Sequence, residues 1–281
     1  MKLKGLRRSR NIEDRRLSGG GGRGAGIGGV GLIVVLAIGY FAGIDVTPLL
    51  QGMQGGGVQS SQPRTLSAEE ERAADFTARV LGSTEEVWSQ LMPQQAGQAY
   101  RPPVMVLYSG VTQSPCGGAS GATGPFYCPA DRKAYLDTEF FATLAGRLGA
   151  RGDFAAAYVV AHEVAHHVQN ELDILGQVSE ARQSASTAQA NALTVRLELQ
   201  ADCLSGVWAQ AVEGALEPGD LDEALNAARR IGDDHLQRQA GRVPQPHTFT
   251  HGTSEQRARW FARGYERGQM SACDTFGAER L

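Results

Sequence analysis

The chain has 281 residues, of which 42% are hydrophobic and 20% are charged, as in an ordinary globular protein with one sizeable core or two small ones. Residues 1–26 contain eight Lys or Arg and two acidic residues, a balance of +6, so the net charge of −3 leaves −9 on the remainder. An acidic main body argues against nucleic acid as a partner.

An uncharged run, 27–44, directly follows the basic residues. At about 1.5 Å of rise per residue, a helix over this run would be roughly 27 Å long, enough to cross the hydrocarbon core of a bilayer. Because Lys and Arg favour the cytoplasmic side, the sequence predicts a basic cytoplasmic tail (1–26), one transmembrane helix (27–44) and a body outside the cytoplasm. Two alternatives stay open: a cleaved signal peptide, although no Ala-x-Ala site follows, and a Gly-rich soluble segment.

Residues 45–66 are rich in Gly, Gln and Ser and have few side chains able to bury area, which is typical of a flexible linker. We therefore expect the folded domain to span 67–281. Ser67 and Glu70 have the spacing of a capping box, so a helix should begin just after Ser67. A second short helix is expected over 84–91.

Short apolar runs then predict a small sheet. The expected strands are 104–108, 126–128 and 133–137, with a glycine-rich loop at 117–124. Beyond them the apolar spacing becomes helical. We expect helices near 139–148, 153–173, 179–213, 219–232 and 254–268. The predicted fold is α+β, mostly helical with a small N-terminal sheet.

The four cysteines, Cys116, Cys128, Cys203 and Cys273, contain no Cys-x-x-Cys pair, so a cysteine zinc site is not expected. An even number of cysteines in an exported domain suggests two disulfides. Of the three pairings we favour Cys116–Cys128 with Cys203–Cys273, because the first would close a glycine-rich loop that has little core of its own. Four buried free thiols are the alternative.

The run His162-Glu163-Val164-Ala165-His166 carries the clearest chemistry. Residues 153–170 lack Pro and Gly, and in a helix His162 and His166 lie one turn apart on one face, where two imidazoles can bind one Zn²⁺. Glu163 is turned by about 100° and would flank the metal-bound water, which is where a general base is needed. His167 points away from that face and is expected to pack or lie at the surface.

A catalytic zinc requires a third protein ligand. Extended metzincin spacing would place Gly and His where this chain has Gln169 and Leu172, so that class is excluded. Glu198 and Asp202 share one face of an apolar predicted helix. Glu198 is the candidate ligand, and Asp202 is the candidate partner for the second nitrogen of a ligand histidine. The alternative is a pair of surface acids near Arg196.

These motifs resemble the gluzincin branch of zinc peptidases, and the whole chain is similar to the bacterial family of neutral zinc metallopeptidases. The resemblance also includes Asn-Ile-Glu-Asp-Arg-Arg at 11–16, Gly-Pro-Phe-Tyr-Cys-Pro at 124–129 and Phe-Thr-His-Gly-Thr-Ser at 249–254. It implies a zincin-like fold, one Zn²⁺ per chain, a location in the bacterial cell envelope and a peptide or protein substrate.

The resemblance also suggests how a substrate would be handled. It implies that His251, with Tyr127 or Tyr135, stabilises the oxyanion, and that strand 133–137 is the edge on which an extended peptide lies. The alternative for His251 is a capping or packing role at the turn before Ser254, the expected helix N-cap.

The function that the sequence predicts is a membrane-anchored zinc metallopeptidase that cleaves peptide bonds of envelope proteins or peptides. The alternative is an anchored binding or scaffold protein with a structural or vestigial zinc site. A closed four-ligand site would favour this alternative, because catalytic zinc keeps a position open for water.

Overall fold

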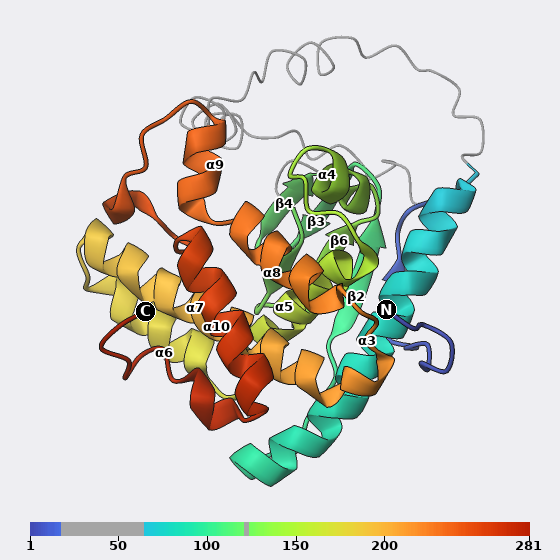
Figure 1. Cartoon of the computed structure of the whole chain (residues 1–281), viewed down its shortest axis with the longest axis horizontal. Coiled ribbons are helices and arrows are strands. Elements are labelled where there is room, and N and C mark those ends of the chain that lie inside the picture. Colours follow the sequence, from blue (N-terminus) through green and yellow to red (C-terminus); the bar gives the residue numbers. More distant parts are fainter. Residues whose placement is uncertain (18–64, 121–123) are drawn as a thin grey trace. The chain divides into compact units, whose positions relative to one another are not determined.

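The computed structural model describes residues 1–17, 65–120 and 124–281. It confirms a mostly helical α+β fold with a small sheet (Figure 1). The helices are α3 (Ala68–Leu91), α4 (Phe140–Gly146), α5 (Asp153–Glu171), α6 (Ile174–Gln183), α7 (Thr187–Ala211), α8 (Asp220–Arg230), α9 (Asp233–Gln239) and α10 (Ser254–Arg267). Short turns of other helix types follow α3 (η1, Met92–Ala96), follow α7 (η2, Glu213–Ala215) and flank α10 (η3, Pro246–Thr248; η4, Met270–Cys273).

The main sheet has four strands in the order β1-β2-β6-β5. They are β1 (Ile12–Asp14), β2 (Val104–Tyr108), β6 (Lys133–Asp137) and β5 (Phe126–Cys128). β1 and β6 flank β2 in parallel, and β5 runs antiparallel to β6. The last three match the predicted strands, whereas β1 was not expected.

Two strand predictions are wrong. The strand over 133–137, predicted to be an edge, is internal, because β2 and β5 pair with its two sides. Part of the predicted glycine-rich loop is the strand β4 (Gly117–Ser120), which forms an antiparallel hairpin with β3 (Val111–Ser114). Backbone pairing decides both cases, and it depends on partners that local sequence does not specify.

The sheet places its two faces in different surroundings. Met105 and Leu107 of β2 belong to the large core formed with the helices, as do the alternate residues of β6. Val106 and Tyr108 point to the opposite face, where they pack with Tyr135. This alternation follows from the two-residue period of a strand.

Helix α5 is the central element, and it packs against α3, α7 and α8. α7 and α10 approach each other especially closely, through glycines on both helices. A Cβ atom added to Gly206 would lie 2.1 Å from the Phe261 carbonyl oxygen, and one added to Gly264 would lie 1.9 Å from that of Cys203. The absence of side chains at Gly206 and Gly264 therefore permits backbone contact between the two helices.

The predicted start of α3 is confirmed, since Ser67 and Glu70 form both halves of a capping box. The separate helix predicted over 84–91 is instead the end of α3. Ser83 and Thr84 lie inside α3 and donate hydroxyl hydrogen bonds of 2.7 Å back to carbonyls of the preceding turn, so neither hydroxyl caps a new helix.

The remaining helices differ from the predictions mainly at their ends. The single helix predicted over 179–213 is two helices, α6, which ends at Gln183, and α7, which begins eight residues later than predicted; α9 was missed. The N-cap of α10 is Thr253, which forms a capping box with Gln256, rather than Ser254.

Residues 1–16 form one compact unit with 66–281, which differs from the predicted separate tail and from a domain confined to 67–281. β1 is part of the sheet, and the preceding segment lies along α3. Glu85 of α3 is buried and accepts hydrogen bonds from Arg7, Ser9 and Asn11 at 2.5, 2.5 and 2.7 Å. The excess of basic residues in 1–26 suggested a separate tail. The structure shows instead that Arg7 pairs with an acidic residue of the folded domain.

In the described part of the chain, no helix has both the length and the apolar character needed to cross a membrane. The predicted span 27–44 and most of the predicted linker 45–66 lie outside the described residues.

Candidate metal centre

Three side chains from two helices meet at one point. His162 and His166 lie on α5, and Glu198 lies on α7. The Nε2 atom of His162 is 3.2 Å from Glu198 Oε2, and that of His166 is 3.5 Å from Glu198 Oε1. One ligand atom of each residue lies within 4.8 Å of the others. The structure thus brings together the three predicted zinc ligands.

The opposite ring nitrogen of each histidine has an acceptor atom within 2.9 Å, and the contact of His166 has the geometry of a hydrogen bond whereas that of His162 does not. His162 Nδ1 lies 2.9 Å from Asp202 Oδ1, and His166 Nδ1 lies 2.8 Å from Gln169 Oε1. An acceptor at Nδ1 favours the tautomer whose Nε2 lone pair is available for a metal. Asp202 therefore occupies the position predicted for it, whereas the role of Gln169 was not foreseen.

Asp202 is part of a buried polar cluster. Arg257 of α10 donates to both of its carboxylate oxygens, at 2.8 and 2.9 Å, and the Tyr158 hydroxyl donates at 2.5 Å. All three side chains are almost completely buried. Burial alone would raise the pKa of Asp202, but the charges and hydrogen bonds of Arg257 and His162 together outweigh it and lower the pKa. A charged carboxylate on α7 is thus held beside His162 by groups from two other helices, α5 and α10.

Charge at the site suits a divalent cation. Burial alone would raise the pKa of Glu198, but the charges and hydrogen bonds of His166 and His162 outweigh it and hold the pKa well below its usual range. Burial lowers the pKa of His162, yet the interactions with Asp202 and Glu198 raise it to about 10, so a metal ion that binds this ring must displace a proton from it. Two imidazoles and an ionised carboxylate form a donor set that Zn²⁺ accepts.

Glu163 follows the first histidine and is 8% exposed. Burial raises its pKa, while the nearby charges of His166 and His162 act in the opposite direction and are smaller. A carboxylate with a raised pKa is a stronger base than an exposed one, which suits proton transfer near neutral pH.

His251 lies in the segment before α10, on a loop organised by Asp233. One Asp233 oxygen accepts hydrogen bonds from three successive backbone N–H groups, those of Thr250, His251 and Gly252. The other lies 3.2 Å from His251 Nδ1. Burial lowers the pKa of His251, but the hydrogen bond to Asp233 and the charge of Glu198 raise it overall. The side chain of His251 is 48% exposed.

The two tyrosines proposed as oxyanion partners have their hydroxyls bound elsewhere. The Tyr127 hydroxyl lies 3.0 Å from His167 Nδ1 and accepts from Asn170 at 3.1 Å. The Tyr135 hydroxyl donates to Asp131 at 2.5 Å. Both hydroxyls are thus engaged by other side chains in this structure, and their part in an oxyanion site stays a prediction.

His167 packs as predicted. It is almost fully buried, with its Nε2 atom 2.6 Å from the Arg101 carbonyl oxygen. Burial lowers its pKa to about 4.

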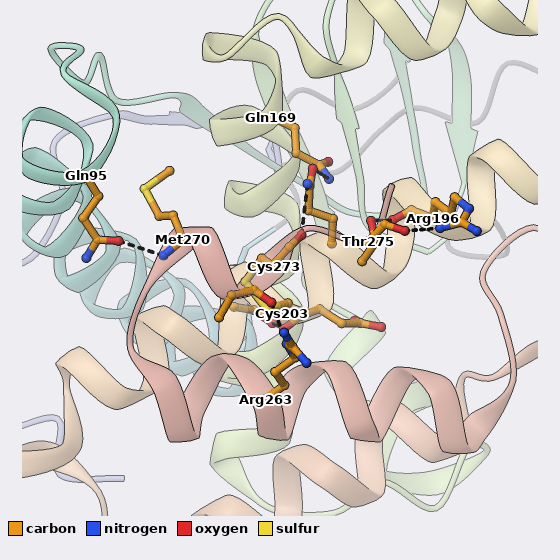
Figure 2. The surroundings of a disulfide bond; sticks show 12 residues. Gln95, Gln169, Arg196, Cys203, Arg263, Met270, Cys273 and Thr275 are labelled. Carbon is orange, nitrogen blue, oxygen red and sulfur yellow. Dashed lines mark hydrogen bonds between the residues drawn. A yellow bond between two sulfur atoms is a disulfide. The ribbon is translucent and has the colours of Figure 1, made fainter. Parts of the chain in front are cut away.

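The structure contains the disulfides Cys116–Cys128 and Cys203–Cys273, which is the pairing favoured from the sequence. The first joins the β3–β4 hairpin region to the end of β5. The second joins α7, at the residue after Asp202, to the turn η4 (Figure 2).

A second group of acids in the described residues also has the spacing of a cation site: Asp153, Asp220 and Glu223. The Met1 ammonium lies 2.8 Å from Asp153 Oδ1 and 3.1 Å from Asp220 Oδ2. Burial lowers the pKa of this amine, but its hydrogen bonds to the acids raise it to about 10. We assign no metal to this group, because the ammonium already supplies the positive charge.

The sequence analysis did not assign a role in the metal centre to three residues that the structure places there. Tyr158 lies four residues before His162, and Gln169 lies three residues after His166, so helical spacing alone could have placed both beside the ligands. Arg257 had no local signal, since it reaches Asp202 from another helix.

Known proteins resemble this chain along almost its whole length. The sequence profile of the family described as "Putative neutral zinc metallopeptidase" matches residues 1–276. The chain is 46% identical over 288 aligned residues to "Uncharacterized protein YpfJ" of Escherichia coli strain K12, with 99% of both proteins covered. It is 40% identical over 264 residues to "Uncharacterized protein Rv2575" of Mycobacterium tuberculosis strain H37Rv, covering 83% of this chain and 86% of the relative. No solved structure matches it.

Proposed function

Because this chain belongs to the neutral zinc metallopeptidase family, we propose that it is a zinc-dependent endopeptidase that hydrolyses peptide bonds of proteins or peptides. The observation that carries the proposal is the convergence of His162, His166 and Glu198, with Glu163 on the same helix as both histidines. The family relatives bear no functional name, so the substrate is left as a peptide chain.

His162, His166 and Glu198 would hold one Zn²⁺ per chain. Zinc at such a site acidifies bound water and polarises a carbonyl group. Asp202 and Gln169 orient the two imidazoles, and Arg257 keeps Asp202 ionised. The protein thus supplies a neutral nitrogen from each histidine and a charged oxygen from Glu198.

Glu163 would accept the proton of the attacking water and later deliver it to the leaving amine. Its burial favours this role, because a raised pKa increases the strength of the carboxylate as a base and makes its protonated form accessible. His251 would donate to the carbonyl oxygen as negative charge develops there. Asp233 supports that role by raising the pKa of His251 and fixing its loop.

We place the substrate along β5 instead of β6. β5 is the outer strand of the sheet on this side among the described residues, and it packs against α5. Its Tyr127 contacts His167, the residue after a proposed zinc ligand. An extended peptide paired with this strand by main-chain hydrogen bonds would lie beside α5, the helix that carries His162 and His166.

We propose that the catalytic domain lies in the bacterial envelope and associates with a membrane through 27–44. The two disulfides support an oxidising location. A single crossing by 27–44 would separate residues 1–16 from the unit that contains them, so a cytoplasmic N-terminus conflicts with the pairing of β1. We therefore place residues 16 and 66 on the same side of the membrane.

Labelling of intact cells tests the location. Single cysteines replacing Arg8 and Arg280, both exposed, should react equally with a membrane-impermeant maleimide. Labelling of position 280 but not of position 8 would restore the single-pass topology.

Two variants test the function. Glu163→Gln should retain one zinc per chain and lose hydrolysis of unstructured peptides, and Glu198→Ala should lose most of its zinc. Full activity in Glu163→Gln would remove Glu163 as the base. A wild-type chain that binds zinc but cleaves no peptide or envelope protein would favour the scaffold alternative.

A further inference from the structure

We propose that Gln169 and Gln200 are positioning residues that hold His166 in its metal-binding tautomer, and that the Cys203–Cys273 disulfide anchors this pair. The inference rests on the proposed function in one respect, namely that His166 is a zinc ligand. It adds a role for two neutral side chains and for a disulfide that lies outside the metal centre.

A continuous hydrogen-bonded path joins His166 to the disulfide. His166 Nδ1 is bonded to Gln169 Oε1 at 2.8 Å. Gln169 Nε2 donates to the Leu197 carbonyl at 2.8 Å and to Gln200 Oε1 at 3.0 Å. Gln200 Nε2 in turn donates to the Cys273 carbonyl at 3.1 Å. Gln169 is fully buried and Gln200 nearly so, which makes water a poor substitute for either amide.

The Cys273 carbonyl determines how both amide groups are oriented. A backbone carbonyl only accepts, so the Cys273 carbonyl requires the NH₂ group of Gln200 to face it. The amide oxygen of Gln200 then faces Gln169, which must present its own NH₂ group to that oxygen and to the Leu197 carbonyl. The remaining Gln169 oxygen faces His166. Because this oxygen also only accepts, the proton of the neutral ring must be on Nδ1.

The result is a lone pair on His166 Nε2, the atom that lies 3.5 Å from Glu198. Without the Gln169 oxygen, the Glu198 carboxylate would be the favoured acceptor, and the proton would move to Nε2. In that tautomer His166 cannot bind a metal through Nε2. The position of the Cys273 carbonyl therefore determines, through the amides of Gln200 and Gln169, which ring nitrogen of His166 carries the proton.

The disulfide determines where that carbonyl lies. Cys273 ends the turn η4 and is bonded to Cys203 of α7, the helix that also carries Gln200 and Glu198 (Figure 2). On the C-terminal side of the turn, Thr275 donates its hydroxyl to the Arg196 carbonyl at 2.6 Å. Loss of the disulfide would leave only hydrogen bonds between the end of η4 and α7, so the carbonyl that accepts from Gln200 would be held less firmly.

The two histidines are thus supported in different ways. His162 faces a carboxylate, Asp202, whose position depends on Arg257. His166 faces a neutral amide whose orientation depends on a disulfide. Breaking the Cys203–Cys273 bond should therefore weaken zinc binding through His166, which makes the metal centre sensitive to reduction.

Zinc affinity and the His166 tautomer test the proposal. Competition with a chelator should show Gln169→Leu binding zinc about 10- to 100-fold more weakly than the wild type, as for other partners of metal-bound histidines. Gln200→Leu should show a smaller loss in the same direction. Gln177→Leu, an exposed glutamine on α6, is the matched control and should leave the affinity unchanged.

Nitrogen-15 NMR of the zinc-free protein, at a pH where the ring is neutral, supplies the second measurement. His166 should carry its proton on Nδ1 in the wild type and on Nε2 in Gln169→Leu. A Gln169→Leu protein with wild-type affinity and an Nδ1 proton would overturn the proposal. If the wild type binds no zinc, the proposed function fails, and the tautomer measurement still judges the hydrogen-bonded path.

Replacing both cysteines of a disulfide by serine tests whether the Cys203–Cys273 bond anchors the two glutamines. Replacing Cys203 and Cys273 together should weaken zinc binding, and adding Gln200→Leu should cause little further loss, because both changes break the same path. Replacing Cys116 and Cys128 together should not affect zinc binding. If the two changes reduced zinc affinity additively, the disulfide and the glutamines would act independently, which would contradict the proposed anchor. If the Cys203/Cys273 variant does not fold, Gln200→Leu, which keeps both disulfides, decides the result.

Discussion

Replacing Arg257 by Met should be among the most destabilising single changes in the metal centre. Arg257 is 2% exposed and donates two hydrogen bonds to Asp202, which is fully buried, and one to the Tyr158 hydroxyl at 3.2 Å. The variant would keep the Asp202 carboxylate in the core without its cation. Removing one partner of a buried ion pair lowers the free energy of unfolding by about 3–5 kcal/mol.

Arg259→Met is the matched control, two residues further along α10. Its guanidinium lies 3.7 Å from Glu255, and the two side chains are 37% and 82% exposed. An exposed pair of this kind contributes about 0–1 kcal/mol. The comparison therefore isolates burial, because the helix, the residue type and the substitution are the same.

Urea unfolding in the presence of a chelator would measure both variants without a contribution from zinc. The double variant Arg257→Met/Asp202→Leu should regain part of the lost stability, since it removes the unpaired charge. Equal losses for Arg257→Met and Arg259→Met, or a double variant less stable than Arg257→Met, would refute the reasoning. Zinc affinity should also fall in Arg257→Met, because Asp202 would no longer be held beside His162.

Three further changes test other parts of the molecule. The folded pKa of His167, about 4, is below the unfolded value of about 6.5, so its neutral form contributes stability that is complete above pH 6.5 and is lost as the pH falls to 4. Wild-type stability in chelator should therefore fall over this range by about 3 kcal/mol more than that of His167→Asn, and equal slopes would contradict this. Gly264→Ala should cost about 1–3 kcal/mol in urea unfolding because its Cβ would meet the Cys203 carbonyl, whereas Gly146→Ala, with open space around it, should cost nothing. Glu85→Ala should speed tryptic cleavage within the first ten residues at least tenfold, unlike Glu86→Ala, whose side chain is exposed; equal rates would mean that Glu85 does not hold this segment.

The two helices that carry the proposed zinc ligands could be predicted, because helical spacing is visible within a short stretch of sequence. Four-residue spacing places His162 beside His166, and the same spacing places Glu198 beside Asp202 within α7. An apolar sequence free of Pro and Gly around each pair made the helices clear. What spacing cannot supply is the convergence of α5 with α7, which the structure provides through packing of the two helices.

The features that were missed depend on distant partners. β1 has the sequence Ile-Glu-Asp, which lacks the apolar alternation of a strand, and pairing with β2 makes it one. The internal position of β6 depends on that same sheet order. Tyr127 has a suitable hydroxyl for an oxyanion site, but its contact with His167 engages it elsewhere.

The incorporation of β1 has a practical consequence for anyone expressing this protein. A recombinant fragment beginning at residue 67 would expose the backbone groups of β2 that β1 normally pairs, and unpaired strand edges promote aggregation. Arg16 donates to the Glu70 carbonyl at 2.7 Å, so the residues on either side of 17–65 lie near each other. A short artificial loop joining residue 16 to residue 66 would remove the hydrophobic run while preserving the sheet, and should yield the better-behaved sample for crystallisation.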